Sequence, residues 1–158
     1  MHQPQGAAFD VVLILHVGCV VVGIATTVTA ATTAGRLRHA LGSAGPLPDT
    51  LRRYFRPGIN WAGRTIYGIP AFGFALVAMS QGTYALTDAW ILGGLVAFVA
   101  LALLSEVVLW PAERRVQMAL AEGATADSAE SSAIVMARAG GAALILLLAG
   151  TVLMIAQP

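Results

Sequence analysis

Four stretches of apolar residues, separated by polar segments, dominate the pattern of the chain. They cover residues 7–34, 58–80, 88–110 and 133–156. As helices rising about 1.5 Å per residue, such stretches cross a hydrocarbon core roughly 30 Å thick. The third is the clearest, because Trp90 and Trp110 bracket it and only Ser105 and Glu106 between them are polar. We therefore predict an all-α protein, a single membrane domain of residues 1–158 built as a four-helix bundle.

Several irregularities are expected in and beside these spans. Pro70 falls in the middle of the second span and should kink it. Pro111 follows the third span, where we expect it to restart a short helix that lies along the membrane surface. In the first span, His16, Cys19 and Gly23 begin a stripe of small or polar residues that should face other helices.

The placement of arginine predicts the orientation of the bundle. The segments 35–57 and 111–132 hold seven arginines, whereas residues 81–88 and both ends of the chain hold none. The positive-inside rule puts the two arginine-bearing loops in the cytoplasm and both termini on the periplasmic or exterior side. We expect anionic lipid headgroups to bind these side chains, Arg36, Arg38, Arg52, Arg53, Arg56, Arg114 and Arg115. Three tryptophans, Trp61, Trp90 and Trp110, are expected to anchor the helix ends at the interfaces.

Composition narrows the class of protein further. The chain is 58% hydrophobic and only 11% charged, against about 25% charged residues in a soluble domain. All nine basic side chains are arginine, and Ala, Gly and Val are abundant, which is typical of a bacterial plasma-membrane protein from a GC-rich genome. A lone cysteine excludes an internal disulfide, and no pattern for nucleic-acid binding or catalysis is present.

Three charged residues should meet at one depth within the membrane. Arg64 lies three residues inside Trp61, Glu106 lies four inside Trp110, and Arg138 precedes about eighteen mostly apolar residues of the fourth span. A charge inside a membrane helix costs roughly 2.5–3.5 kcal/mol on insertion scales, so these groups should pair. They could form a structural clamp between spans two, three and four, or an intramembrane proton or anion site.

A second candidate site lies nearer the exterior. His16, Cys19, Met79 and Met154 are all expected in the outer half of the bundle. Imidazole, thiolate and thioether groups suit copper(I), and a histidine with a methionine suits haem iron. The alternative is that the methionines pack between helices and His16 hydrogen-bonds to a neighbouring helix.

Short motifs give the chain a resemblance to a known group. They are Leu15-His16-Val17 with Arg36 after the first span, and the run from Val107 to Pro111 followed by Arg114 and Arg115. In these the chain resembles small four-helix bacterial integral membrane proteins of unknown function, similar in layout to CopD-type copper-resistance and haem-handling proteins. The resemblance implies a haem or copper role for His16. The further histidines of haem-handling members have no counterparts in spans two to four.

The sequence therefore leaves three functions open. The first is a non-catalytic accessory or scaffold subunit of a larger membrane assembly, such as a respiratory complex, or a homo-oligomer. Its partners would be membrane lipids and either other subunits or further copies of itself, with no nucleic acid and no enzyme activity. The second is a haem- or copper-binding protein that uses His16. The third is a small proton- or anion-coupled carrier that uses Glu106 with Arg64 and Arg138.

Overall fold

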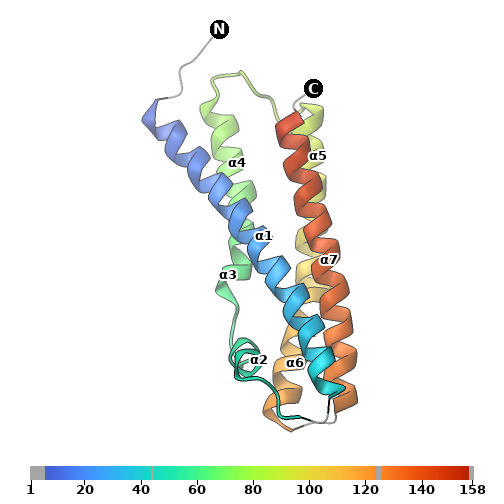
Figure 1. Ribbon diagram of the computed structural model, residues 1–158. Coiled ribbons are helices and arrows are strands. Elements are labelled where there is room, and N and C mark those ends of the chain that lie inside the picture. The colour runs from blue at the N-terminus through green and yellow to red at the C-terminus, as the bar shows by residue number, and fades with distance from the viewer. Residues whose placement is uncertain (1–5, 44, 124–125, 157–158) are drawn as a thin grey trace.

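The fold is a bundle of long helices, seen in a computed structural model that describes residues 6–43, 45–123 and 126–156. Within these ranges the chain is all-helical and has no strand. Four helices are long and apolar enough to cross a membrane, as the sequence predicts. The start of α1 (Ala7–Leu41) and the end of α7 (Ala126–Ala156) lie at one end of the bundle (Figure 1). We call this the outer end and the opposite one the inner end, following the predicted orientation.

The remaining elements complete two further membrane-length rods and one short helix. The short helix α2 (Asp49–Tyr54) lies at the inner end. One rod consists of α3, the 3-10 turn η1 and α4; the other consists of α5, the π turn η2 and α6. Their bounds are α3 (Trp61–Arg64), η1 (Thr65–Tyr67), α4 (Gly68–Met79), α5 (Ala89–Leu104), η2 (Ser105–Leu109) and α6 (Trp110–Ala121).

Two helices are longer at the inner end than the apolar pattern predicts. The first continues to Leu41 rather than ending near residue 34, and the last begins at 126 rather than 133. Packing explains both extensions, because Leu37 of α1 and Ala129 of α7, which lie in the added turns, are buried. The predicted loops 35–57 and 111–132 are therefore partly helical.

The third rod continues through Pro111 instead of stopping there. We expected a separate surface helix after Trp110, but α6 packs against α7 and buries Ala112 and Val116. A proline clashes with the carbonyl four residues earlier and cannot donate to it. For Pro111 that residue is Val107, which lies inside η2, where the regular α-helical bonding is already interrupted.

The second rod accommodates Pro70 in a similar way. The residue four positions before it is Ile66, the middle of the 3-10 turn η1. The irregularity predicted by Pro70 therefore lies one turn ahead of the proline. Asn60 starts this rod by accepting a hydrogen bond from the Gly63 N–H through its side-chain oxygen, at 3.2 Å.

Small residues bring α1 close to its neighbours. Gly23, Thr27 and Ala30 are buried, so the predicted stripe does face other helices over this part of α1. The Thr27 hydroxyl donates to the Gly23 carbonyl at 2.9 Å and so needs no partner on another helix. At Gly140 of α7, an added Cβ would lie 3.2 Å from the backbone nitrogen of Ala31, which shows how closely the two backbones approach.

The inner and outer halves of the bundle are packed differently. The largest fully buried side chains gather mainly in the inner half, among them Leu37, Phe55, Val116 and Met136. Towards the outer end α1 stays with α4 and α5 stays with α7, and the two pairs diverge (Figure 1). Large apolar side chains such as Ile14 and Val96 are about 70% exposed there (69% and 70%), as expected for a surface that faces lipid.

Candidate functional site

The first candidate site joins the second and third rods at the level of their irregular turns. An Arg64 Nη1 atom lies 3.7 Å from Oε1 of Glu106. The Tyr67 hydroxyl donates a hydrogen bond of 2.7 Å to the same oxygen. The Arg64 guanidinium also lies over the Trp110 ring, with its central carbon 4.3 Å from the ring centroid. This is the distance range of a cation–π contact. We call Arg64, Tyr67 and Glu106 the surface triad.

The surface triad faces outward rather than into the bundle. The side chain of Glu106 is 49% exposed and that of Arg64 is 35% exposed. Beside Glu106, Leu103 and Val107 are 60% and 69% exposed and form an apolar surface of the kind that faces lipid. The carboxylate is therefore displayed on a surface whose neighbouring side chains are apolar.

The third charge of the expected cluster lies elsewhere. Arg138 is exposed on α7 and makes no ion pair within the described part of the chain. The structure thus brings Arg64 and Glu106 together and leaves Arg138 apart. The resulting link joins spans two and three only, and Tyr67, three residues after Arg64, supplies the third member.

The tryptophans occupy three different environments. Trp61 is 72% exposed at the start of α3, as expected of an interfacial anchor. Trp90 is half-buried at the outer end and meets Tyr84 edge-to-face, with ring centroids 5.6 Å apart. Trp110 is only 9% exposed and lies beneath Arg64, so little of its ring is open to the surroundings.

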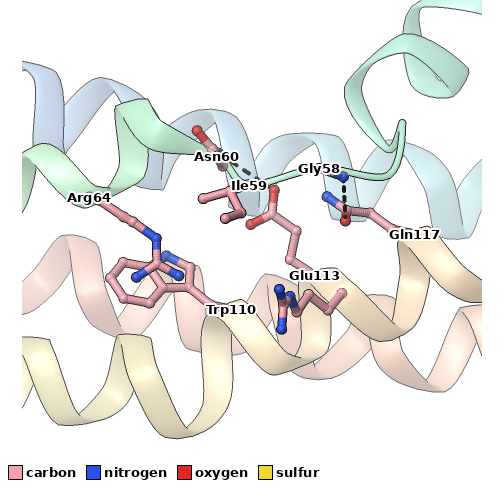
Figure 2. Close-up of a pocket in the computed structure, with 8 residues that line it drawn as sticks. Gly58, Ile59, Asn60, Arg64, Trp110, Glu113 and Gln117 are labelled. Atoms are coloured by element: carbon pink, nitrogen blue, oxygen red, sulfur yellow. Dashed lines mark hydrogen bonds between the residues drawn. The ribbon is translucent and has the colours of Figure 1, made fainter.

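A buried polar cluster lies beside the triad, on the side of the inner end. Its members come from the segment before α3 and from α6 (Figure 2). Asn60 Nδ2 donates to Oε1 of Glu113 at 3.5 Å, and the Gly58 N–H donates to Oε1 of Gln117 at 3.4 Å. Glu113 and Gln117 are each only 6% exposed. The adjoining space of about 20 Å³ has room for one water molecule.

Tyr54 of α2 adds a phenol to this cluster. Its hydroxyl is buried and forms no hydrogen bond of ordinary geometry with any residue that the structure describes. Burial, and then the negative charge of the nearby Glu113 carboxylate, raises the pKa of Tyr54 well above its usual range. The phenol therefore stays protonated at physiological pH. The cluster ties α2 and the segment before α3 to α6, which is a structural role.

This cluster is not among the predicted sites, although the sequence carries a signal for it. Buried residues of the third rod recur every four positions, at Leu101, Ser105, Leu109, Glu113 and Gln117. A spacing of four exceeds the helical period of 3.6, so such a row drifts around a regular helix. The π turn takes up part of this drift and keeps Glu113 and Gln117 on the inward face.

The second candidate site is a partly open cleft of about 530 Å³ in the outer half. It lies between the two diverging helix pairs and is lined from α1, α4, α5 and α7, mostly by apolar side chains. His16 reaches it from α1, and its Nδ1 lies 2.9 Å from the Ile69 carbonyl oxygen. Because a carbonyl only accepts, Nδ1 carries the proton, and Nε2 of the neutral ring is left as an acceptor.

The four expected metal ligands are not gathered in this cleft. His16 and Met154 line it, whereas Met79 and Cys19 are not among its lining residues. The Cys19 side chain instead occupies the space where a Cβ on Gly68 would lie. Within the described ranges no three His, Cys, Asp or Glu side chains form a metal-binding group. The cleft thus brings together two of the four expected ligands, His16 and Met154, and a copper or haem role for His16 stays a prediction.

The arginines of the inner end all remain exposed. They are Arg36, Arg38, Arg52, Arg53, Arg56, Arg114 and Arg115. Arg38 forms a long contact of 3.9 Å with Glu130, and the Nε–H of Arg52 donates to the Leu47 carbonyl at 3.3 Å. An exposed pair of this length contributes little to stability. The side chains are thus free to reach lipid headgroups at this end of the bundle.

Comparisons with known proteins find no relative of this chain. No protein family, curated protein or solved structure matches the chain. The resemblance to small four-helix membrane proteins therefore stays a prediction from short motifs.

Proposed function

We propose that this protein is a non-catalytic, self-associating component of a bacterial plasma membrane, with both termini on the exterior side. The observation that carries the proposal is the surface triad, which displays a carboxylate on a face otherwise suited to lipid. The arginines support the orientation, because the segments that hold them lie at one end of the bundle (Figure 1).

The Glu106 carboxylate is only weakly paired within one chain. Its contact with Arg64 is a single long one of 3.7 Å rather than a bidentate pair, and half of the side chain is exposed. A charge within a membrane helix is costly, and a carboxylate with spare acceptor capacity gains from further donors. A neighbouring subunit that covers this face would supply them.

Charge complementarity identifies the neighbour as a second copy of the chain. The triad presents both an arginine and a carboxylate on one surface, so the surface is complementary to itself. A two-fold axis through such a patch brings Arg64 of each copy towards Glu106 of the other. Leu92, Val96, Val99 and Leu103 extend the patch along α5 at alternating spacings of four and three, as in a helix-pairing seam.

Cysteine cross-linking in native membranes tests the proposal. In a Cys19→Ser background, Val107→Cys at the patch should give a cross-linked dimer under mild oxidation. Val21→Cys, which is exposed to a similar extent on α1 (59% against 69%), should not. Glu106→Gln should weaken the dimer at least tenfold, as measured by dilution of labelled protein in lipid bilayers. A monomer at all protein-to-lipid ratios would refute self-association.

The same variant separates the carrier hypothesis from ours. If Glu106 moved protons, Glu106→Gln would abolish proton flux into vesicles and leave the dimer unchanged. Our proposal expects the reverse, a loss of dimer with no flux in either protein. Purification with one different polypeptide in fixed ratio, in place of a second copy, would also contradict it.

A further inference from the structure

The outer cleft has the size and lining of a site for a lipophilic small molecule. Its volume of about 530 Å³ falls within the roughly 300–1,000 Å³ typical of ligand pockets. On α1 the lining runs from Phe9 to Val20, a separation of eleven residue steps, which is about 16 Å along the helix axis. The cleft thus reaches from the outer end towards the middle of the bilayer, and a molecule dissolved in lipid can enter it.

Within this apolar lining His16 supplies a fixed hydrogen-bond acceptor. The bond from Nδ1 to the Ile69 carbonyl sets both the tautomer and the orientation of the ring. Gly73 has no side chain to displace the ring, and a Cβ there would lie 3.4 Å from Cε1 of His16. Nε2, on the opposite side of the ring from the donated proton, is therefore available to a ligand that carries an O–H group.

Aromatic side chains surround the same space and favour a planar ligand. Phe9, Phe74, Tyr84, Trp90 and Phe98 all line the cleft, and they come from three of the helices and the connection between α4 and α5. Aromatic rings attract other rings in stacked or edge-to-face arrangements beyond simple burial of area. An aromatic headgroup would gain these contacts, whereas a plain alkyl chain would not.

We infer that the outer cleft binds a membrane-soluble aromatic alcohol, a phenol or hydroquinone with an apolar tail, and that its hydroxyl donates to Nε2 of His16. The hydroxyl pairs with an acceptor that is otherwise unused in the described structure, and the tail lies against the apolar walls of the cleft. The cleft is separate from the surface triad, so this inference does not depend on the proposal that the protein self-associates.

Binding of decylhydroquinone to the purified protein in lipid nanodiscs tests the inference, with quenching of tryptophan fluorescence as the signal. The comparison compound is its dimethyl ether, which keeps the ring and tail but has no O–H donor. One neutral hydrogen bond predicts that the wild type binds the hydroquinone about five- to tenfold more tightly than the ether. Equal affinity for the two compounds would overturn the inference.

Two substitutions locate the site. His16→Phe keeps an aromatic ring but loses both the Nε2 acceptor and the hydrogen bond to Ile69. It should remove the preference and leave both compounds bound with the affinity of the ether. Gly150→Leu should abolish binding of both, since Gly150 lines the cleft. Gly141→Leu is the matched control on the same helix, where an added Cβ meets nothing within 4 Å, and it should bind as the wild type does.

The remaining outcomes count against the inference. A preference that survived His16→Phe would place the hydroxyl elsewhere. A Soret band in the purified wild type that His16→Phe removed would show that Nε2 binds haem iron instead. Each variant is first checked for the wild-type helical signal and a monodisperse profile. If His16→Phe does not fold, His16→Leu tests the same point, because it also removes the acceptor, and the preference for the hydroquinone should again be lost.

Discussion

The helices of the bundle are held together by different contacts in its inner and outer halves. At the inner end, fully buried side chains such as Leu37 and Phe55 join a polar cluster around Glu113. At the outer end the helices separate around an apolar cleft whose fixed polar contact is that of His16 with Ile69. Lipid tails are as apolar as leucine, so apolar side chains alone give helices little reason to associate within the bilayer.

This difference indicates which half holds the fold together and which half is available for binding. The inner half combines close packing with hydrogen bonds between elements distant in sequence, such as Asn60 with Glu113. In the outer half, some side chains that line the cleft, such as Leu13 and Phe74, are 41% and 47% exposed, and shortening one of these removes fewer contacts. Stability should therefore depend on the inner half and ligand binding on the outer half.

The largest expected effect comes from shortening one leucine in each half of α1. Leu37 is fully buried at the inner end, and Leu13, in the wall of the cleft, is 41% exposed. Leu37→Ala should lower the free energy of unfolding by about 2–5 kcal/mol, and Leu13→Ala by less than about 1 kcal/mol. Reversible unfolding in mixed micelles of increasing SDS fraction measures both. Equal losses would remove the distinction between the halves.

A smaller effect is expected from adding a side chain where α1 and α7 touch. In Gly140→Leu the new Cβ would lie 3.1–3.3 Å from the Cβ, backbone nitrogen and Cα of Ala31, and backbone atoms yield poorly. We expect a loss of about 1–3 kcal/mol in the same assay. Gly141→Leu, one residue further along, has open space and should unfold like the wild type.

The smallest effect concerns the buried phenol of Tyr54. Its hydroxyl has no hydrogen bond within the described structure, so Tyr54→Phe should change stability at pH 7 by less than about 1 kcal/mol, in either direction. Folding raises the pKa of Tyr54. The contribution of this side chain to the free energy of unfolding is therefore present below the unfolded pKa of about 10 and is lost as the pH rises above it.

Unfolding curves between pH 8 and pH 11 check the sign of this effect. The wild type should lose stability at the alkaline end, and Tyr54→Phe should lose less over the same range. A variant that is much weaker at pH 7 would show that the hydroxyl has a bonding partner in solution. An unchanged alkaline loss would show that folding does not raise the pKa of Tyr54.

Hydropathy was sufficient to predict the four long helices but not where they end. The apolar pattern marks the part of a helix that lies in lipid, whereas helices such as α1 continue beyond it as long as their residues find packing partners. Leu37 is such a residue, and it lies among the arginines of a segment assigned to a loop. The end of a membrane helix therefore depends on contacts with residues distant in sequence.

The candidate sites were only partly predictable for a similar reason. Depth counting from Trp61 and Trp110 placed Arg64 and Glu106 at one level, and the two do meet. The same counting said nothing about direction around the helix, so it grouped Arg138 with them and left out Glu113. Direction depends on the π turn, which no residue type marks as clearly as proline or glycine marks a bend.

The two irregular turns have a mechanical consequence for the whole bundle. η1 and η2 lie at the same level and are joined there by the hydrogen bond from Tyr67 to Glu106. A rod that lacks regular backbone bonding at one level bends most easily at that level. Because both neighbouring rods have irregular backbone hydrogen bonding at this level, we expect them to bend there together. We therefore expect α4 and α5, the outer parts of these two rods, to change their angle to the inner parts more easily than the uninterrupted helices α1 and α7 can bend.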